Sequence, residues 1–218
     1  MAYALPYDKI MENALYGRAA KMWGGADKAT SSDWPQPHGY KMDQAKAKAL
    51  MKEAGLEGGI ETTLSLDTGT ATVGEPTVLL IQESLAKIGV KVNIDKVPGA
   101  NWRTSLNKKE LPLVLNRFSG WLDYSEYYFY WNFHGSNSLF NISSYQNKEM
   151  DALIDKARFT TDTAEYEAAV KAFIKLCMSD VPVIPINQPI HDVAMQKNVA
   201  GYEFWFHREP DYRQFAKS

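Results

Sequence analysis

The residue types that can bind a ligand gather in one aromatic stretch, residues 117–134. It contains a carboxylate, Asp123, two positions after Trp121 and directly before Tyr124. A carboxylate holds a cation such as a ligand's amine, and aromatic rings add contact area at low entropic cost. Arg117, at the start of the stretch, carries a fork of donors that matches a carboxylate. These residue types in this spacing point to the binding of a small solute.

The same residues allow other interpretations. The rings can form core, with Asp123 capping a turn, and Arg117 can belong to a surface ion pair. His134, which ends the stretch, can be a hydrogen-bonded loop residue. An enzyme is a further alternative, because Asp123 and Glu126 among sugar-stacking rings are similar to the carboxylate pair of a glycoside hydrolase. Three positions along a loop, however, say little about the distance between two carboxylates.

The composition is that of an ordinary soluble globular protein, with one large domain or two small ones. The chain has 218 residues, of which 45% are hydrophobic and 23% charged. A net charge of -2 gives no sign of the basic surface that binds nucleic acid or an anionic membrane. No apolar run reaches the roughly 20 residues of a membrane span, and no signal peptide begins at Met1. We therefore expect no nucleic-acid partner.

Metal, disulfide and phosphate-binding motifs are missing from the sequence. Cys177 is the single cysteine, so no internal disulfide is expected, and it stands on the apolar face of an expected helix. The four histidines are far apart, and none forms an HxxxH or HExxH pair. The glycine-rich phosphate motifs are absent as well. We expect neither a metal site within one element nor a cofactor.

The periodicity of apolar residues predicts an α/β fold with a mostly parallel sheet flanked by helices. Alternation predicts strands at residues 60–66, 90–97 and 111–118. Helical spacing predicts helices between them, the first opened by Pro76, and further helices at residues 6–17, 43–54, 147–157 and 162–177. Strands that alternate with helices pair in parallel, and ligands sit beyond the carboxyl ends of such strands. The loop after residue 118 lies at that position. Two prolines make residues 181–186 an edge or crossing segment.

Several motifs in order resemble one known family. They are Leu15-Tyr16-Gly17 at a helix end, Tyr40-Lys41-Met42-Asp43 with Glu53-Ala54-Gly55, Gly120-Trp121-Leu122-Asp123-Tyr124, Ser144-Tyr145-Gln146-Asn147 with Met150-Asp151-Ala152-Leu153-Ile154, Pro182-Val183-Ile184-Pro185-Ile186, and Val199-Ala200-Gly201-Tyr202. Together they resemble the C-terminal half of the extracytoplasmic solute-binding proteins of ABC importers, in the peptide/nickel (family 5) group. Each motif is weak alone, and their common order makes the resemblance specific.

The resemblance implies a periplasmic-binding-protein type II fold, in which two lobes close on a ligand without catalysis. Residues 1–186 would form the C-terminal ligand-binding lobe. Residues 187–218 would be a returning tail that packs on an N-terminal lobe missing from this chain. The implied partners are a peptide-like small solute and, through the full-length protein, an ABC permease in the membrane. The implied location is periplasmic or extracytoplasmic.

The resemblance also assigns roles to the aromatic stretch. In peptide-binding members the aspartate of the G-W-x-x-D-Y loop pairs with the ligand's α-amino group, and the tryptophan lines the pocket. By position these are Asp123 and Trp121, followed by Tyr124. His134 corresponds to a metal or haem contact in the nickel branch. The loop here is one residue shorter than the family pattern, and it has Ser125-Glu126 where the family has a proline.

Overall fold

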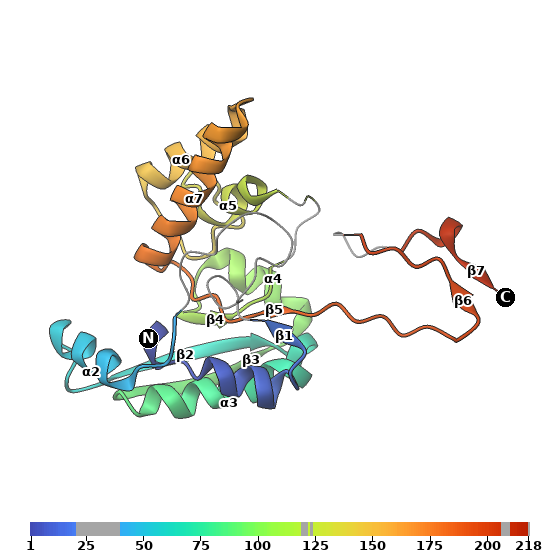
Figure 1. The fold of residues 1–218 in the computed structure, drawn as a ribbon. Helices are drawn as coiled ribbons and strands as arrows, with labels where there is room; N and C mark the ends of the chain where they lie inside the picture. The colour runs from blue at the N-terminus through green and yellow to red at the C-terminus, as the bar shows by residue number, and fades with distance from the viewer. Residues whose placement is uncertain (21–39, 119–121, 123, 206–209, 218) are drawn as a thin grey trace.

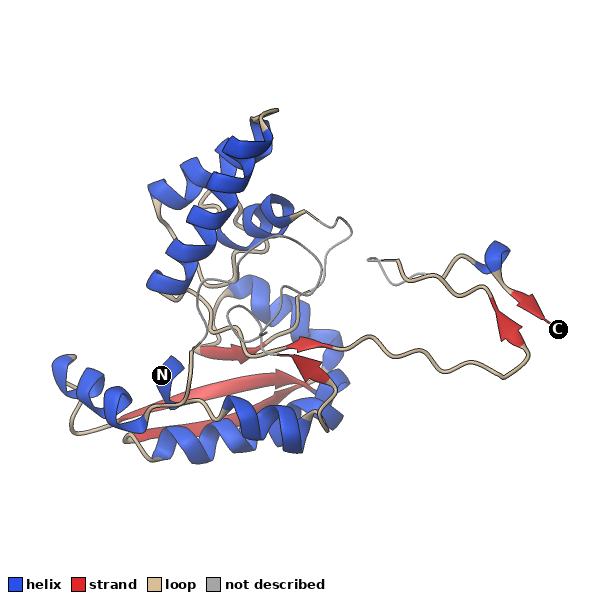
Figure 2. Cartoon of the chain, in the orientation of Figure 1, coloured by secondary structure: helices blue, strands red, loops and turns tan. Residues whose placement is uncertain are grey.

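A parallel sheet forms the layer around which the rest of the chain packs. The computed structural model describes residues 1–20, 40–118, 122, 124–205 and 210–217. Its main sheet has three strands in the order β3-β2-β4, and the strands are β2 (Ile60–Asp67), β3 (Val90–Val97) and β4 (Leu113–Leu115). Ile60 pairs with Val90 and Leu64 with Leu113, both in parallel, so β2 is the central strand. Figure 2 shows this sheet in red.

Two helices connect the three strands. Helix α3 (Ala71–Ala86) leads from β2 to β3, and α4 (Gly99–Lys108) leads from β3 back across β2 to β4. Right-handed crossovers in opposite directions place two such helices on opposite faces of a sheet, and Figure 1 shows α3 below the sheet and α4 above it. Val78, Ile81 and Leu85 of α3 are buried in the apolar core that this helix shares with the sheet.

The N-terminal elements pack at the side of α3. They are a 3-10 turn η1 (Ala2–Ala4), a short helix α1 (Tyr7–Lys9), a π-helical turn η2 (Ile10–Ala14) and helix α2 (Gln44–Glu53). The Ser84 hydroxyl donates to the carbonyl of Ala4 at 2.6 Å, and the Gln44 carboxamide donates to Ser84 Oγ at 3.0 Å. These bonds join η1, α2 and α3 to one another, so the chain from its first residues belongs to the core.

Three helices form a second unit with a core of its own. They are α5 (Ser125–Phe133), α6 (Lys148–Phe159) and α7 (Thr163–Asp180), and Figure 1 shows them together above the sheet. The rings of Phe129 and Phe173 stack with centroids 4.1 Å apart, and both side chains are buried. The buried apolar residues of this helical unit make a cluster separate from the cluster around the sheet.

The last part of the chain extends away from both units. Strand β5 (Gln188–Pro189) pairs antiparallel with β1 (Ala19–Ala20), and the chain then runs out to a small hairpin of β6 (Val199–Ala200) and β7 (Ala216–Lys217), with a 3-10 turn η4 (Tyr212–Gln214) before β7. This arm carries exposed apolar side chains, namely Ile190, Val193, Met195, Phe204, Trp205 and Tyr212.

Much of the predicted secondary structure is confirmed. Residues 90–97 form a strand with the predicted bounds. Asp43, Asn147 and Asp162 cap helices, each through a carboxylate or carboxamide oxygen that accepts backbone N–H groups. Residues 181–186 form no regular strand, as their prolines predict.

Two predicted boundaries and one predicted element type are wrong. Helix α3 begins at Ala71 rather than Pro76, because Asp67 caps the turn at Gly69 and the helix continues directly from it with the proline inside. The predicted strand over residues 111–118 shortens to β4, because its partner β2 ends one residue beyond the last pair, Leu66 with Leu115. The aromatic run, interpreted as a loop, folds as α5. Its rings lie on several sides of that helix, so no amphipathic stripe marks it.

Candidate functional site

The candidate ligand loop joins the sheet to the helical unit. Strand β4 ends at Leu115, and α5 starts at Ser125, so residues 116–124 connect the carboxyl end of a parallel strand to a helix. In open α/β sheets ligands bind at this edge. The sheet therefore places the loop where the sequence predicts a site.

Arg117 lies beside an open cleft. Its side chain is exposed and lines the cleft together with Asn116 and Phe118. No hydrogen bond or ion pair joins the guanidinium to any residue that the structure describes. The ring of Phe118 meets that of Tyr128 edge to face, with centroids 5.6 Å apart, and so anchors the start of the loop on α5. Arg117 thus presents an exposed side chain at the cleft.

Tyr124 occupies the N-cap position of α5. Its side chain is 59% exposed, and it makes no capping hydrogen bond through that side chain. A ring held at a fixed backbone position and open to solvent can meet a ligand. Trp121 and Asp123, the other two predicted loop residues, lie outside the described residues.

A tyrosine of α7 holds the first turn of α5 in place. The Tyr166 hydroxyl donates to Glu126 Oε2 at 2.7 Å. Burial, and then the hydrogen bond to the Glu126 carboxylate, raises the pKa of Tyr166. Glu126 therefore has a structural partner in the helical unit, whereas the glycoside-hydrolase alternative needs it as a free acid or base.

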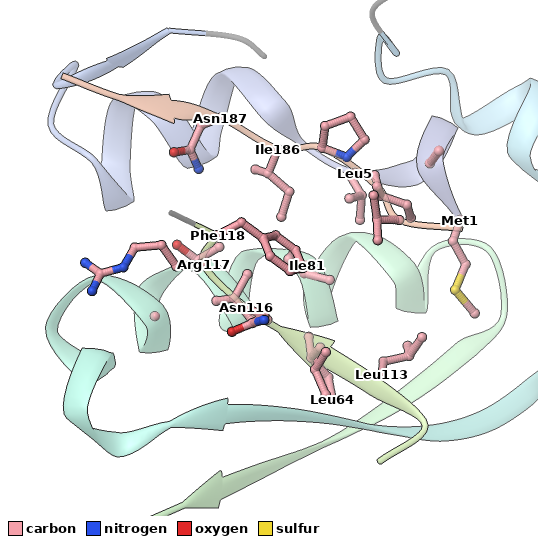
Figure 3. A pocket seen from close by; sticks show the side chains of 18 of the residues that line it. Met1, Leu5, Leu64, Ile81, Leu113, Asn116, Arg117, Phe118, Ile186 and Asn187 are labelled. Atoms are coloured by element: carbon pink, nitrogen blue, oxygen red, sulfur yellow. The ribbon is translucent and has the colours of Figure 1, made fainter. Parts of the chain in front are cut away.

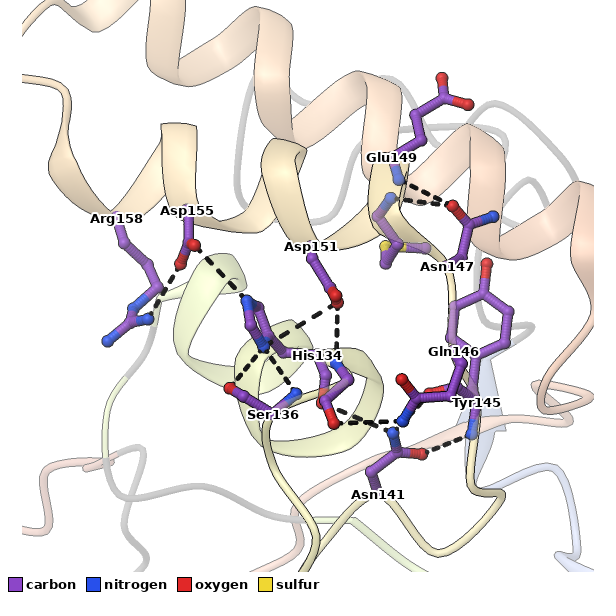
Figure 4. Close-up of polar contacts among 12 residues, drawn as sticks. His134, Ser136, Asn141, Tyr145, Gln146, Asn147, Glu149, Asp151, Asp155 and Arg158 are labelled. Carbon is purple, nitrogen blue, oxygen red and sulfur yellow. Dashed lines mark hydrogen bonds and ion pairs between the residues drawn. The ribbon is translucent and has the colours of Figure 1, made fainter.

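His134 lies at the far end of α5 from the loop. It is 8% exposed, and its Nδ1 stands 2.7 Å from Ser136 Oγ and accepts the backbone N–H of Ser136 at 3.1 Å. Its Nε2 has no hydrogen-bond partner among the described residues and stands 3.5 Å from a carboxylate oxygen of Asp155 on α6. Figure 4 shows this ring between Asp151 and Asp155. The structure does not bring His134 to the cleft that Arg117 lines.

The cleft itself is large and mostly apolar. It has a volume of about 1670 Å³ and runs beside β4, α3 and residues 181–187. Figure 3 shows Leu5, Ile81, Leu113 and Ile186 along it, with Arg117 at one end. The sequence marked residues 182–186 by their prolines and by their resemblance to a family motif, and neither signal placed them on the wall of a cleft. Among the strands that the structure describes, β4 pairs with β2 alone, and a free strand edge has no signature in one sequence.

No other chemistry emerges from the part of the chain that the structure describes. No three side chains of histidine, cysteine, aspartate or glutamate gather there in a way that could hold a metal ion. Across the same residues, no helix has the length and apolar character that crossing a bilayer requires.

The family model that describes the middle region of the bacterial extracellular solute-binding proteins of family 5 matches residues 1–140. The chain belongs to that family. Its members bind solutes and are not enzymes, which is the class that the sequence predicts. The match covers the sheet, the candidate ligand loop and α5, and residues 181–187 of the cleft lie beyond it.

Curated relatives of this family 5 chain have names that refer to peptides. The Di/tripeptide-binding protein 2 of Pseudomonas aeruginosa (strain UCBPP-PA14) is 29% identical over 174 residues, which are 78% of this chain and 32% of the relative. The probable D,D-dipeptide-binding periplasmic protein DdpA of Escherichia coli (strain K12) is 24% identical over 208 residues, which are 94% of this chain and 40% of the relative. The chain thus spans about a third to two fifths of the length of these relatives.

Solved structures confirm the α/β fold of the periplasmic-binding-protein type II kind. The dipeptide-binding protein from Pseudoalteromonas sp. SM9913, in complex with Met-Leu, superposes with a TM-score of 0.86 at 22% identity. The whole of this chain aligns with 44% of the length of that protein. The periplasmic binding protein DppA from Helicobacter pylori, in complex with peptide STSA, gives a TM-score of 0.82 at 24% identity, over 92% of this chain and 40% of that one.

Proposed function

We propose that this chain is the C-terminal lobe and returning tail of a solute-binding protein that delivers a peptide-like solute to an ABC importer. One observation carries the proposal. Within a family 5 chain, the loop of residues 116–124 follows the carboxyl end of β4, where a parallel sheet presents ligands. The names of the curated relatives support a peptide-like solute over other classes.

Each loop residue has a role in this proposal. Asp123 pairs with the α-amino group of the solute, and Trp121 and Tyr124 supply apolar contact. Arg117, exposed and without a partner among the described residues, pairs with a solute carboxylate. His134 takes only an indirect role, because it is buried at the opposite end of α5.

The division into lobe and tail is also part of the proposal. Residues 1–186 contain both apolar cores, and they form the ligand-binding lobe. Residues 187–218 form the arm, whose exposed apolar side chains pack on the N-terminal lobe. That lobe supplies the other wall of the ligand cleft, the longer protein works outside the cytoplasm, and its membrane partner is the permease.

A tryptophan-fluorescence titration of the chain rejoined to its upstream region tests the amine anchor. Short peptides should give a saturable change, and Asp123→Ala should weaken their binding at least about thirtyfold, because it leaves a buried charge without its partner. Glu110→Ala, which removes an exposed carboxylate at the start of the segment leading into β4, is the matched control and should leave affinity unchanged. Equal affinity in the Asp123→Ala protein would refute this role.

The same titration tests the carboxylate anchor. Arg117→Ala should weaken peptides with a free carboxyl terminus about tenfold or more, and should leave the corresponding peptide amides unaffected. An equal loss for acids and amides would show that Arg117 does not read the carboxylate.

A carbohydrate solute is the second candidate. The exposed ring of Tyr124 favours it, and a solved relative from Thermotoga maritima, an oligopeptide-binding protein with a TM-score of 0.78 at 21% identity, holds mannohexaose. Oligosaccharides therefore belong in the titration. Saturable binding of oligosaccharides that is indifferent to Asp123→Ala would replace the peptide proposal with this one.

A further inference from the structure

A serine, a histidine and an aspartate stand next to one another where α5 meets α6. His134 directly follows α5, Ser136 comes two positions later, and Asp155 belongs to α6. Ser136 Oγ stands 2.7 Å from His134 Nδ1, and a carboxylate oxygen of Asp155 stands 3.5 Å from His134 Nε2 (Figure 4). An imidazole between a hydroxyl and a carboxylate is the arrangement that activates nucleophilic serines.

The hydrogen bonds of His134 decide which ring nitrogen carries the proton. Its Nδ1 accepts the backbone N–H of Ser136 at 3.1 Å, so this nitrogen has a free lone pair and the proton of the neutral ring is on Nε2. The Ser136 hydroxyl, which contacts the same nitrogen, can then only donate to it. Nδ1 is therefore placed to act as a base toward Ser136, while Nε2 faces Asp155.

The surroundings of the ring suit the positive charge that a proton transfer to it would create. Carboxylate oxygens stand 3.9 Å from Nδ1, in Asp151, and 3.5 Å from Nε2, in Asp155. Arg158 binds the other carboxylate oxygen of Asp155 at 3.1 Å and so fixes that side chain. An opposite charge within about 4–6 Å favours the charged form of a buried group. The two aspartates can thus stabilise a transient imidazolium.

The serine is held beside the ring and remains accessible. The N–H of Gly135 donates to Asp151 Oδ1 at 2.7 Å, and the Gln146 carboxamide donates to the Gly135 carbonyl at 3.1 Å. The peptide between the histidine and the serine is therefore fixed on both sides. Ser136 itself is exposed, so a reagent from solution can reach its hydroxyl without a rearrangement of the protein.

The backbone donors around the serine are already in use. Gly135 N–H binds Asp151, Ser136 N–H binds His134 Nδ1, and Asn137 N–H binds the His134 carbonyl at 2.9 Å. None of these three groups is left to stabilise the oxyanion of a tetrahedral intermediate, which is the largest contribution in serine hydrolases. The group can therefore react once with an activated reagent, whereas rapid turnover, which this non-catalytic family lacks, is not expected.

We propose that Ser136 is a covalent modification site, which takes the acyl group of an activated aryl ester. Ser136 Oγ forms a bond to the acyl carbon, and the hydroxyl proton passes to His134 Nδ1. The bond between the acyl carbon and the leaving phenolate breaks, and the phenolate then takes the proton from the imidazolium. The products are an acyl-serine and a phenol. The proposal is independent of the solute that the protein binds, since neither Ser136 nor His134 lines the cleft.

Site-resolved mass spectrometry of the protein treated with p-nitrophenyl acetate tests the proposal. Ser138 is the matched control, because it is exposed in the same loop and no histidine that the structure describes hydrogen-bonds to it. Ser136 should be acetylated at least about tenfold faster than Ser138, since a positioned base typically contributes roughly 10²–10⁴-fold. Ser136→Ala should lose the rapidly formed adduct, and Ser138→Ala should keep it. Equal rates at the two serines would overturn the proposal.

Replacement of the ring tests whether it acts as the base. His134→Ala should slow the acetylation of Ser136 to the rate of Ser138, and free imidazole, which fits the space of the deleted ring, should restore part of the rate. Restoration by imidazole would not be seen if the ring only supported the fold. Rapid acetylation of Ser136 in the His134→Ala protein would overturn the proposal.

The carboxylate provides a second test, which also decides if His134→Ala fails to fold. Asp155→Asn should slow the acetylation of Ser136 about tenfold or more, and Asp155→Glu, which keeps a carboxylate, should retain most of the rate. Arg158→Gln is the matched control, because it removes the ion-pair partner of Asp155 and leaves the carboxylate in place, so it should not slow the reaction. An unchanged rate in Asp155→Asn would overturn the proposal.

Discussion

Removal of one ring from the helical unit should loosen that unit alone. Phe173 is fully buried, and its ring stacks on Phe129 with centroids 4.1 Å apart and planes 28° from parallel. Replacing such a phenylalanine with alanine removes burial and leaves a cavity, which together cost about 3–5 kcal/mol. That is a large part of the roughly 5–15 kcal/mol that keeps a domain folded. Because the helical unit and the sheet have separate apolar cores, most of the loss should fall on α5, α6 and α7.

Native-state hydrogen exchange of Phe173→Ala measures where the loss falls. Amides of α6 and α7 should open roughly 150- to 5,000-fold more often, which is what about 3–5 kcal/mol corresponds to, while amides of β2 and β3 should keep most of their protection. The matched control is Phe159→Ala, since Phe159 is 73% exposed and its loss should change stability by no more than about 0.5 kcal/mol. A loss below about 1 kcal/mol, or an equal loss of protection in β2, would refute the idea of two separately stabilised units.

Three further predictions concern backbone, pH and the start of α5. Gly59→Ala should lower the free energy of unfolding, measured in urea, by at least about 1–2 kcal/mol. The reason is that Gly59 has a φ of +82° and that a Cβ there would come within 2.5 Å of the Gly89 carbonyl oxygen. An unchanged urea midpoint would contradict this. Burial raises the pKa of the Cys177 thiol from 9.0 to about 12. Between pH 9 and 12 the folded protein therefore keeps a proton that the unfolded protein loses. The free energy of unfolding should be unaffected by this group below pH 9 and should fall as the pH rises from 9 to 12. The free energy of unfolding of Cys177→Ala should not show this fall, and the same pH dependence in both proteins would contradict the prediction. Tyr166→Phe should weaken solute binding by the rejoined protein. Adding Glu126→Gln to that variant should weaken binding little further, because the two side chains share one hydrogen bond. Fully additive losses of affinity would show that the two residues act independently.

The sequence predicts the sheet better than the site. Alternation in residues 90–97 and helical spacing in residues 43–54 and 147–157 are local signals, and the structure has the strand and both helices. The beginning of α3 was missed because Pro76 looks like a first helical residue, while the true start depends on the turn that Asp67 caps. Helix α5 was missed because aromatic residues on all sides give no periodicity. Their burial comes from α6 and α7, which no local pattern reveals.

The position of the candidate site stays a prediction from the order of strands and helices, which puts the residues after β4 at the ligand edge. The structure places Arg117 beside the cleft and Tyr124 at the N-cap of α5. The structure places His134 away from the cleft, because the length of α5 separates the two ends of the aromatic stretch. The open cleft beside β4 depends on which of the described strands lack a neighbour, and that is a property of the whole fold.

The pairing of β1 with β5 has a consequence for synthesis on the ribosome. Arg18, next to β1, forms its ion pair with Asp192, 174 positions later, so β1 gains the partner that the structure describes only once β5 has been made. At about 5–20 residues per second, this delay lasts roughly 10–30 s. The main sheet closes far sooner, because Ile60 meets Val90. During the delay the segment before β1 already has its own packing, because η2 contacts α3 and both belong to the core around the sheet.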